Sequence, residues 1–167
     1  GRAVAVGDAQ AGERAVGIGD EQVAGTGRRQ ACGLGLHRMT GRADGTAGVE
    51  RHRTGGDGVD VFDYNASNES GVGAAVRDFI ADFVAGTDKL DFSTLDANTS
   101  VAGNQDFTFN ATDGALFTGA GQIVYHYEGS GGSEITVIEG NVNNNLGTDF
   151  QVALVGHITL SASDFVL

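Results

Sequence analysis

The sequence contains no proline, no tryptophan and a single cysteine, Cys32. One cysteine cannot form a disulfide within the chain, so a disulfide-stabilised scaffold is not expected. Without proline every backbone N–H stays available for hydrogen bonding, and the 28 glycines suit repeated turns at positive φ. The sequence has no apolar run of about 18 residues, so no transmembrane helix is predicted. The N-terminus also lacks the layout of a cleavable signal peptide, so export would need another route or a signal on a longer precursor.

Basic residues are nearly absent from the last two-thirds of the chain. Residues 1–54 hold eight Arg against six acidic residues, whereas residues 55–167 hold only Arg77 and Lys89 against sixteen acidic residues. A surface this acidic repels nucleic acid and anionic lipid and attracts cations. We therefore expect no nucleic-acid partner and no stable membrane insertion. Charge alone is equally compatible with a plain soluble acidic surface.

Residues 1–54 are rich in Gly, Ala and Arg and show no period of 2 or 3.6, so no strand is predicted there. Their composition is typical of a disordered or degenerate-repeat segment. One hypothesis is that this segment comes from a Gly/Asp repeat gene read out of frame, and the alternative is a genuine linker. All Phe and Tyr lie at or after Phe62, so the core is expected in residues 55–167.

From position 59 onward, short β-rich runs alternate with clusters of Gly, Asn, Asp and Ser. This pattern predicts an all-β fold, a β-roll or β-sandwich of short strands. Hairpin-type loops are expected at 86–88 and 129–132, and a short helix at 72–77 with Asn68 or Ser70 as its cap. The predicted strands span residues 59–64, 80–84, 89–92, 107–110, 122–127, 134–139 and 150–154.

Residues 55–63, GGDGVDVFD, fit the nonapeptide G-G-x-G-x-D-x-U-x of calcium-binding parallel β-helices. We predict calcium ligands at Asp57 and Asp60 and at the carbonyls of Gly56 and Gly58, because calcium prefers hard oxygen ligands in flexible geometry. One nonapeptide supplies only half a site, and residues 37–45 and 46–54 do not match a second one. A glycine-rich hairpin turn before a strand is the alternative interpretation.

The run that follows, from Val76 to Ser93, together with the nonapeptide resembles the C-terminal domain of serralysin-type metalloproteases, in the repeats-in-toxin group. That family carries a stretch similar to I-x-D-F-x-x-G-x-D-K-I-D-L-S. The resemblance covers about residues 55–167, and its most specific parts are residues 82–93 and the carboxyl end. The residues that fit the stretch are Ile80, Asp82, Phe83, Gly86, Asp88, Lys89, Leu90, Asp91 and Ser93, with Phe92 where Leu is usual.

The resemblance implies a calcium-binding domain that folds outside the cell and carries an export signal. An acidic residue followed by three apolar residues is similar to the address read by type I secretion machinery, and the end of this chain fits it. Asp82 and Asp88 are weaker candidate calcium ligands. The implied location is secreted and extracellular, with calcium as the cofactor. The implied export signal comprises Asp164, Phe165, Val166 and Leu167.

Residues 141–149 place oxygen-bearing side chains at alternate positions, as in an EF-type calcium loop. The family often has Asp where Asn141 and Asn145 stand here. Gly147 is displaced by one position from the glycine of such a loop, and Val152 replaces the closing Glu. We therefore favour a plain Asn-rich hairpin over a calcium loop.

The sequence contains no enzymatic constellation. It lacks the His-Glu-x-x-His zinc motif, Gly-x-Ser-x-Gly and a phosphate-binding loop, and its four His follow no ligand spacing. The predicted function is thus a non-catalytic calcium-binding domain of a type I-secreted protein. One alternative is a polysaccharide-binding module like those of mannuronan epimerases. The other is a fragment of a serralysin-like protease without its catalytic domain.

Overall fold

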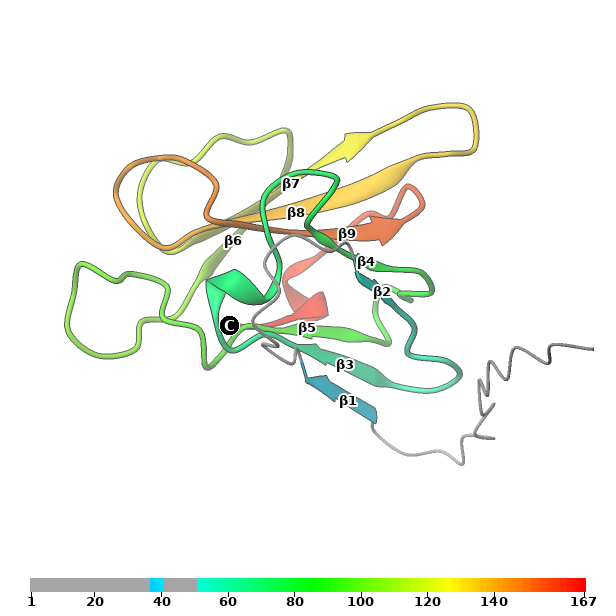
Figure 1. Cartoon of the computed structure of the whole chain (residues 1–167), viewed down its shortest axis with the longest axis horizontal. Helices are drawn as coiled ribbons and strands as arrows, with labels where there is room; N and C mark the ends of the chain where they lie inside the picture. Colours follow the sequence, from blue (N-terminus) through cyan, green and yellow to red (C-terminus); the bar gives the residue numbers. More distant parts are fainter. Residues whose placement is uncertain (1–36, 41–50) are drawn as a thin grey trace, which may run out of the picture. The chain divides into compact units, whose positions relative to one another are not determined.

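The structure, a computed structural model, describes residues 37–40 and 51–167 (Figure 1). These residues belong to one compact unit, residues 31–167. Cys32 and most of the segment 1–54 lie outside the described residues. Over the described ranges, no helix has the length and apolar character needed to cross a membrane.

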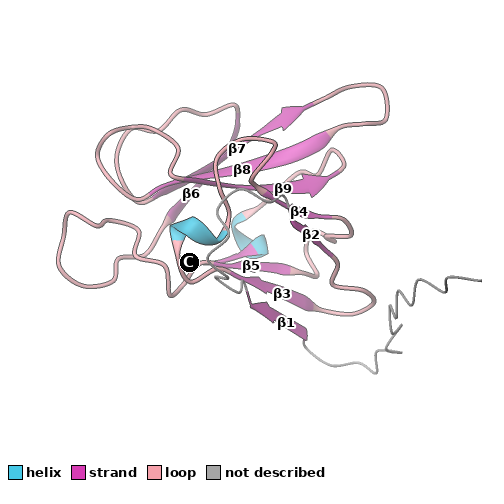
Figure 2. Cartoon of the chain, in the orientation of Figure 1, coloured by secondary structure: helices cyan, strands magenta, loops and turns pink. Residues whose placement is uncertain are grey.

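The regular secondary structure of the described chain is nearly all short strands joined by loops, which confirms the all-β prediction (Figure 2). Two single-turn 3-10 helices interrupt them, η1 (Ser67–Glu69) and η2 (Ala162–Asp164). The strands are β1 (His37–Thr40), β2 (Arg51–Arg53), β3 (Asp60–Asp63), β4 (Asp78–Ile80), β5 (Lys89–Asp91), β6 (Thr108–Asp113), β7 (Gln122–Glu128), β8 (Ile135–Asn141), β9 (Phe150–Val155) and β10 (Phe165–Val166).

The strands form two sheets, which we call sheet A and sheet B. Sheet A has the order β1-β3-β5-β10, and all its neighbours are parallel. Sheet B has the order β2-β4-β9-β8-β7-β6, with antiparallel pairing only in β7-β8 and β8-β9. From β1 to β5 each successive strand joins the other sheet. The first half is therefore a coil of the β-roll type, and the antiparallel strands extend sheet B beyond it.

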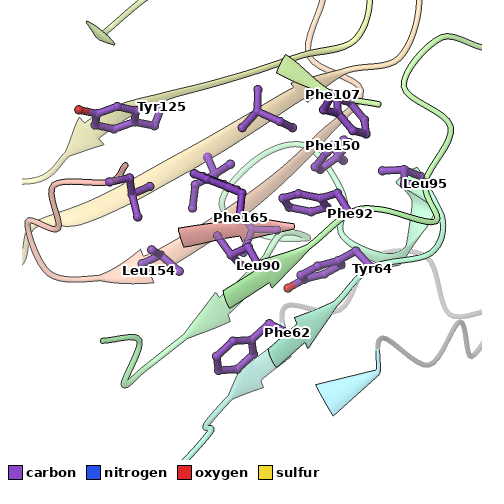
Figure 3. Packing of buried hydrophobic residues seen from close by; sticks show 14 of the residues in the cluster. Phe62, Tyr64, Leu90, Phe92, Leu95, Phe107, Tyr125, Phe150, Leu154 and Phe165 are labelled. Atoms are coloured by element: carbon purple, nitrogen blue, oxygen red, sulfur yellow. The ribbon is translucent and has the colours of Figure 1, made fainter. Parts of the chain in front are cut away.

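The hydrophobic core lies between the two sheets (Figure 3). Phe92, which follows β5, is fully buried and has ring contacts with Tyr64, Phe107, Phe150 and Phe165. These rings come from both sheets and from the connecting segments, so Phe92 joins the layers. Aromatic packing of this kind supplies much of the buried apolar area of a small domain.

Two strands, β1 and β2, lie in the stretch where no strand was predicted. Their sequences, HRMT and RHR, have no apolar alternation, and parallel pairing with β3 and β4 fixes them instead. Arg53 of β2 forms a salt bridge of 2.5 Å with the buried Asp78, and its guanidinium lies 4.9 Å from the Tyr64 ring centroid. Burial raises the pKa of the Tyr64 hydroxyl above its ordinary value. These contacts join the end of the Gly/Ala/Arg-rich segment to the folded unit.

Three local predictions were wrong. Residues 72–77 form no helix, because Gly71 N–H donates to Val76 O and Val76 N–H to Gly73 O, which closes a tight turn. The predicted strand at 80–84 keeps only Ile80, since β4 begins at Asp78. Residues 86–88 are not a hairpin loop, because β4 and β5 belong to different sheets. By contrast, residues 129–132 do connect the antiparallel strands β7 and β8.

Arg77, just before β4, is bound to Glu128, the last residue of β7 in sheet B. Its guanidinium donates to both carboxylate oxygens of Glu128 at 3.0 and 2.6 Å and lies 5.4 Å from the centroid of the Phe79 ring. The hydrogen bonds from Arg77 lower the pKa of Glu128 from 4.5 to about 2. A carboxyl group whose pKa is lower in the folded state stabilises the fold at pH values above its pKa in the unfolded chain. This stabilisation is lost as the pH falls toward the pKa of the folded state.

We expect Arg77→Met to lower the free energy of unfolding by about 1 kcal/mol at neutral pH, a value discounted because Glu128 is half-exposed. The deficit relative to the unmodified chain should shrink as pH falls from 4.5 toward about 2. Urea unfolding over that range, at fixed calcium, measures it. Lys89→Met is the control, since it removes the same charge from sheet A. A deficit that is equal at all pH values would contradict the assignment.

Candidate functional site

The predicted calcium turn, residues 55–60, connects β2 of sheet B to β3 of sheet A. Gly56 and Gly58 have φ of 92° and 127°, which side-chain-bearing residues rarely adopt. Gly55 has no room for a side chain, because a Cβ there would lie 2.5 Å from Asp60 Oδ2. The glycine spacing read from the sequence thus corresponds to real steric demands of this turn.

The four predicted ligand residues lie within this one turn but differ in their exposure. Gly56, Asp57 and Gly58 are exposed, whereas Asp60 is 1% exposed at the start of β3. The backbone N–H of Asp60 donates to Asp88 Oδ1 at 3.0 Å. The turn therefore offers one buried carboxylate next to a solvent-facing carboxylate and exposed backbone.

Asp82 and Asp88 belong to the next turn along the roll, residues 81–88, and they accept hydrogen bonds from the turn before it. The N–H groups of Gly55 and Gly56 donate to the two oxygens of Asp82, both at 2.9 Å. Asp88 accepts from Asp60 N–H at 3.0 Å and from Val84 N–H at 2.8 Å. Both carboxylates therefore connect neighbouring turns through backbone donors.

Asp164 repeats this arrangement one turn further. It is 1% exposed and accepts from Gly86 N–H at 2.6 Å, from Ser161 N–H at 2.7 Å and from Ser161 Oγ at 2.9 Å. We call Asp82, Asp88 and Asp164 the carboxylate ladder, because each one accepts N–H groups from the preceding turn. Sequence reasoning assigned Asp164 only to export, although Ser161-x-x-Asp164 has the spacing of a capping box.

The terminal motif 164–167 is incorporated into the fold. Phe165 is 7% exposed, and its ring centroid lies 4.4 Å from that of Phe109. Phe165 and Val166 form β10, which pairs in parallel with Leu90 and Asp91 of β5. Leu167 packs partly buried against the core, and Val166 is 40% exposed. In the folded domain this motif is the outer strand of sheet A.

The donor set of the turn 55–60 is of the chemical kind that calcium prefers. Its candidate ligands are all oxygens, namely two carboxylates and backbone carbonyls. In the described ranges, no three or more His, Cys, Asp or Glu side chains form a metal-binding group. A complete shell would therefore need backbone carbonyls or a neighbouring turn. Residues 41–50, which precede β2, lie outside the described residues.

A family model and a relative of known name both place this chain with the serralysins. The family model described as peptidase M10 serralysin C terminal matches residues 3–167. Serralysin A of Dickeya chrysanthemi is 35% identical over 107 residues, which is 64% of this chain and 20% of the relative. The chain thus spans a fifth of that relative's length, and the matched family describes the C-terminal, non-catalytic region.

Two solved structures are also similar, both of them subunits of the Azotobacter vinelandii mannuronan C5-epimerase. The AlgE6R3 subunit has 25% identity and a TM-score of 0.46, covering 81% of this chain and 75% of that one. The AlgE6R2 subunit has 21% identity and a TM-score of 0.42, covering 78% and 69%.

Proposed function

We propose that this chain, which belongs to the peptidase M10 serralysin C-terminal family, is the calcium-folding and export domain of a secreted extracellular protein. The observation that carries the proposal is the turn 55–60, where Gly56 and Gly58 have positive φ and Gly55 leaves room for the buried side chain of Asp60. Asp57, Asp60 and the carbonyls of Gly56 and Gly58 are the proposed ligands. Asp82 and Asp88 contribute more weakly, since they already accept backbone hydrogen bonds.

The charge of the domain explains how folding would respond to calcium. Sixteen acidic residues face two basic ones in residues 55–167, so mutual repulsion opposes compaction. Calcium, when bound, supplies positive charge and links hard oxygen ligands. Sites of the extracellular class bind at roughly millimolar calcium, so the chain would stay unfolded where calcium is scarce.

The position of the terminal motif supports export before folding. Asp164 and Phe165 are buried, and β10 is paired with β5. Type I secretion machinery that reads residues 164–167 would therefore need the unfolded chain. A low-calcium compartment provides that state, and a calcium-rich exterior would then fold the domain behind the exporter.

We expect Asp60→Asn to weaken calcium binding by about 10-fold, because one charged ligand becomes a neutral one. Isothermal titration calorimetry of the full chain measures the change. Asp106→Asn is the matched control, since it removes the same charge from an exposed loop position. Equal calcium affinity for the unmodified chain and both variants would count against the turn 55–60 as the binding site.

A further inference from the structure

In the loop that joins β8 to β9, residues 141–149, the side-chain oxygens of three Asn accept hydrogen bonds from the backbone of the same loop. The side-chain oxygens of Asn141, Asn143 and Asn145 accept from the N–H groups two residues on, at 3.1, 2.9 and 2.6 Å. An EF-type calcium loop uses oxygens at positions 1, 3, 5, 7 and 9, with Gly at position 6. Counted from Asn141, position 6 is Leu146, and its φ of 59° is the left-handed conformation that glycine normally provides.

The remaining oxygens of this ring are held by side-chain amides. Asn141 Nδ2 donates to Asn145 Oδ1 at 3.4 Å and to the carbonyl oxygen of Gly147. Asn143 Nδ2 donates to both carboxylate oxygens of Asp149 at 2.9 Å. The oxygen atoms at positions 5, 7 and 9 thus accept hydrogen bonds from N–H donors, which lie where the cation lies in an EF-type calcium loop.

The orientation of the Asn141 amide follows from its neighbours. Asn143 N–H requires an acceptor, and Asn141 Oδ1 provides it at 3.1 Å. The amide nitrogen must then face Asn145 Oδ1 and Gly147 O, both of which are acceptors. If the amide were reversed, Asn141 Oδ1 would face two other oxygens, Asn145 Oδ1 and Gly147 O, and would repel them. Asn141 is 0% exposed, so water cannot relieve such a contact from outside.

We propose that the loop 141–149 forms a ring of oxygens like that of an EF-type calcium loop, and that the side-chain amides of Asn141 and Asn143 occupy the place of the ion. In the folded domain the loop 141–149 consequently keeps its shape without an ion of its own. The sequence-based preference for a hairpin over a calcium loop acquires a mechanism, because two amide groups supply the hydrogen-bond donors in place of the ion. The proposal does not depend on calcium binding elsewhere in the domain.

The same geometry predicts a gain of function. Asn141→Asp replaces the inward N–H donors with a carboxylate oxygen that faces Gly147 O and Asn145 Oδ1. This variant should bind one calcium ion more per chain than the unmodified protein, in the range of about 10⁻⁴–10⁻³ M. Asn144→Asp is the matched control, because Asn144 is exposed and lies outside the alternating set. It adds the same charge to the same loop and should gain no ion.

Calorimetric titration of the full chain and the variants counts the ions, and Asn141→Asp/Asn143→Asp serves as a second variant. If both ring variants fold and bind no more calcium than the unmodified chain, the proposal is wrong. A measurement on the unmodified folded protein decides the case if the variants fail to fold. In about 10 mM calcium, the side-chain amide protons of Asn141 should exchange at least about 10-fold more slowly than those of Asn144. Equal exchange rates would show that the Asn141 amide is not held by Asn145 Oδ1 and Gly147 O and would overturn the proposal.

Discussion

Replacing Phe92 with alanine is expected to lower the free energy of unfolding by about 3–5 kcal/mol. Phe92 is fully buried and its ring contacts four other aromatic rings, including Phe150 of sheet B and Phe165 of sheet A, with centroids at 5.3 and 6.4 Å. Truncation would leave a cavity between the two sheets, where the paired strands limit collapse. A loss of this size is a large part of the stability of a domain of this length.

Chemical denaturation in saturating calcium measures the effect of Phe92→Ala. Leu116→Ala is the control, because Leu116 is 83% exposed and its truncation should change stability by less than about 0.5 kcal/mol. The Phe92→Ala chain should still be exported, since an unfolded chain is the proposed substrate of the secretion machinery. A stability loss of the same size for both variants would show that the core between the sheets is misassigned.

Asp164→Asn is expected to cost about 2–3 kcal/mol of folding stability. The carboxylate accepts three hydrogen bonds, from Gly86 N–H, Ser161 N–H and Ser161 Oγ, at a site that is 1% exposed. An amide of the same size keeps one acceptor oxygen but turns an NH₂ group toward a backbone donor. One or more buried donors then lose their partner, and the last turn separates from the turn 81–88.

Asp164→Asn should also reduce export, because the acidic residue belongs to the proposed signal. The expected loss of export distinguishes this variant from Phe92→Ala, which is destabilised but keeps the sequence of residues 164–167. Denaturation in calcium and secretion through a type I system are measured on the same two variants. Asp106→Asn serves as the charge control for both. Retention of normal stability by Asp164→Asn would exclude its role in the carboxylate ladder, and normal secretion would exclude its role in the signal.

Much of the fold could be predicted from local patterns. The strands β7 and β9 show clear alternation, and the nonapeptide predicted the glycine turn before β3. The strands β1 and β2 escaped detection because they are short and polar, and their positions come from parallel pairing with β3 and β4. Residues 86–88 were misread as a hairpin loop because the local sequence says nothing about which sheet receives the following strand.

The carboxylate ladder shows why part of the site could not be read from the sequence. Its hydrogen bonds join Gly55 to Asp82, Asp60 to Asp88 and Gly86 to Asp164, across 27, 28 and 78 residues. Such pairs exist only once successive coils stack in register. The family resemblance singled out Asp82 and Asp88 as weaker calcium ligands and Asp164 as part of an export signal, and it gave no indication that all three accept backbone N–H groups.

The central claim is that calcium controls folding of this domain, and circular dichroism of the unmodified chain tests it most directly. Spectra and thermal unfolding are recorded with excess chelator and with about 10 mM calcium. We predict a disordered spectrum without a cooperative transition in chelator, and a β-rich spectrum with a cooperative transition in calcium. The same folded spectrum and the same Tm in both conditions would contradict the account.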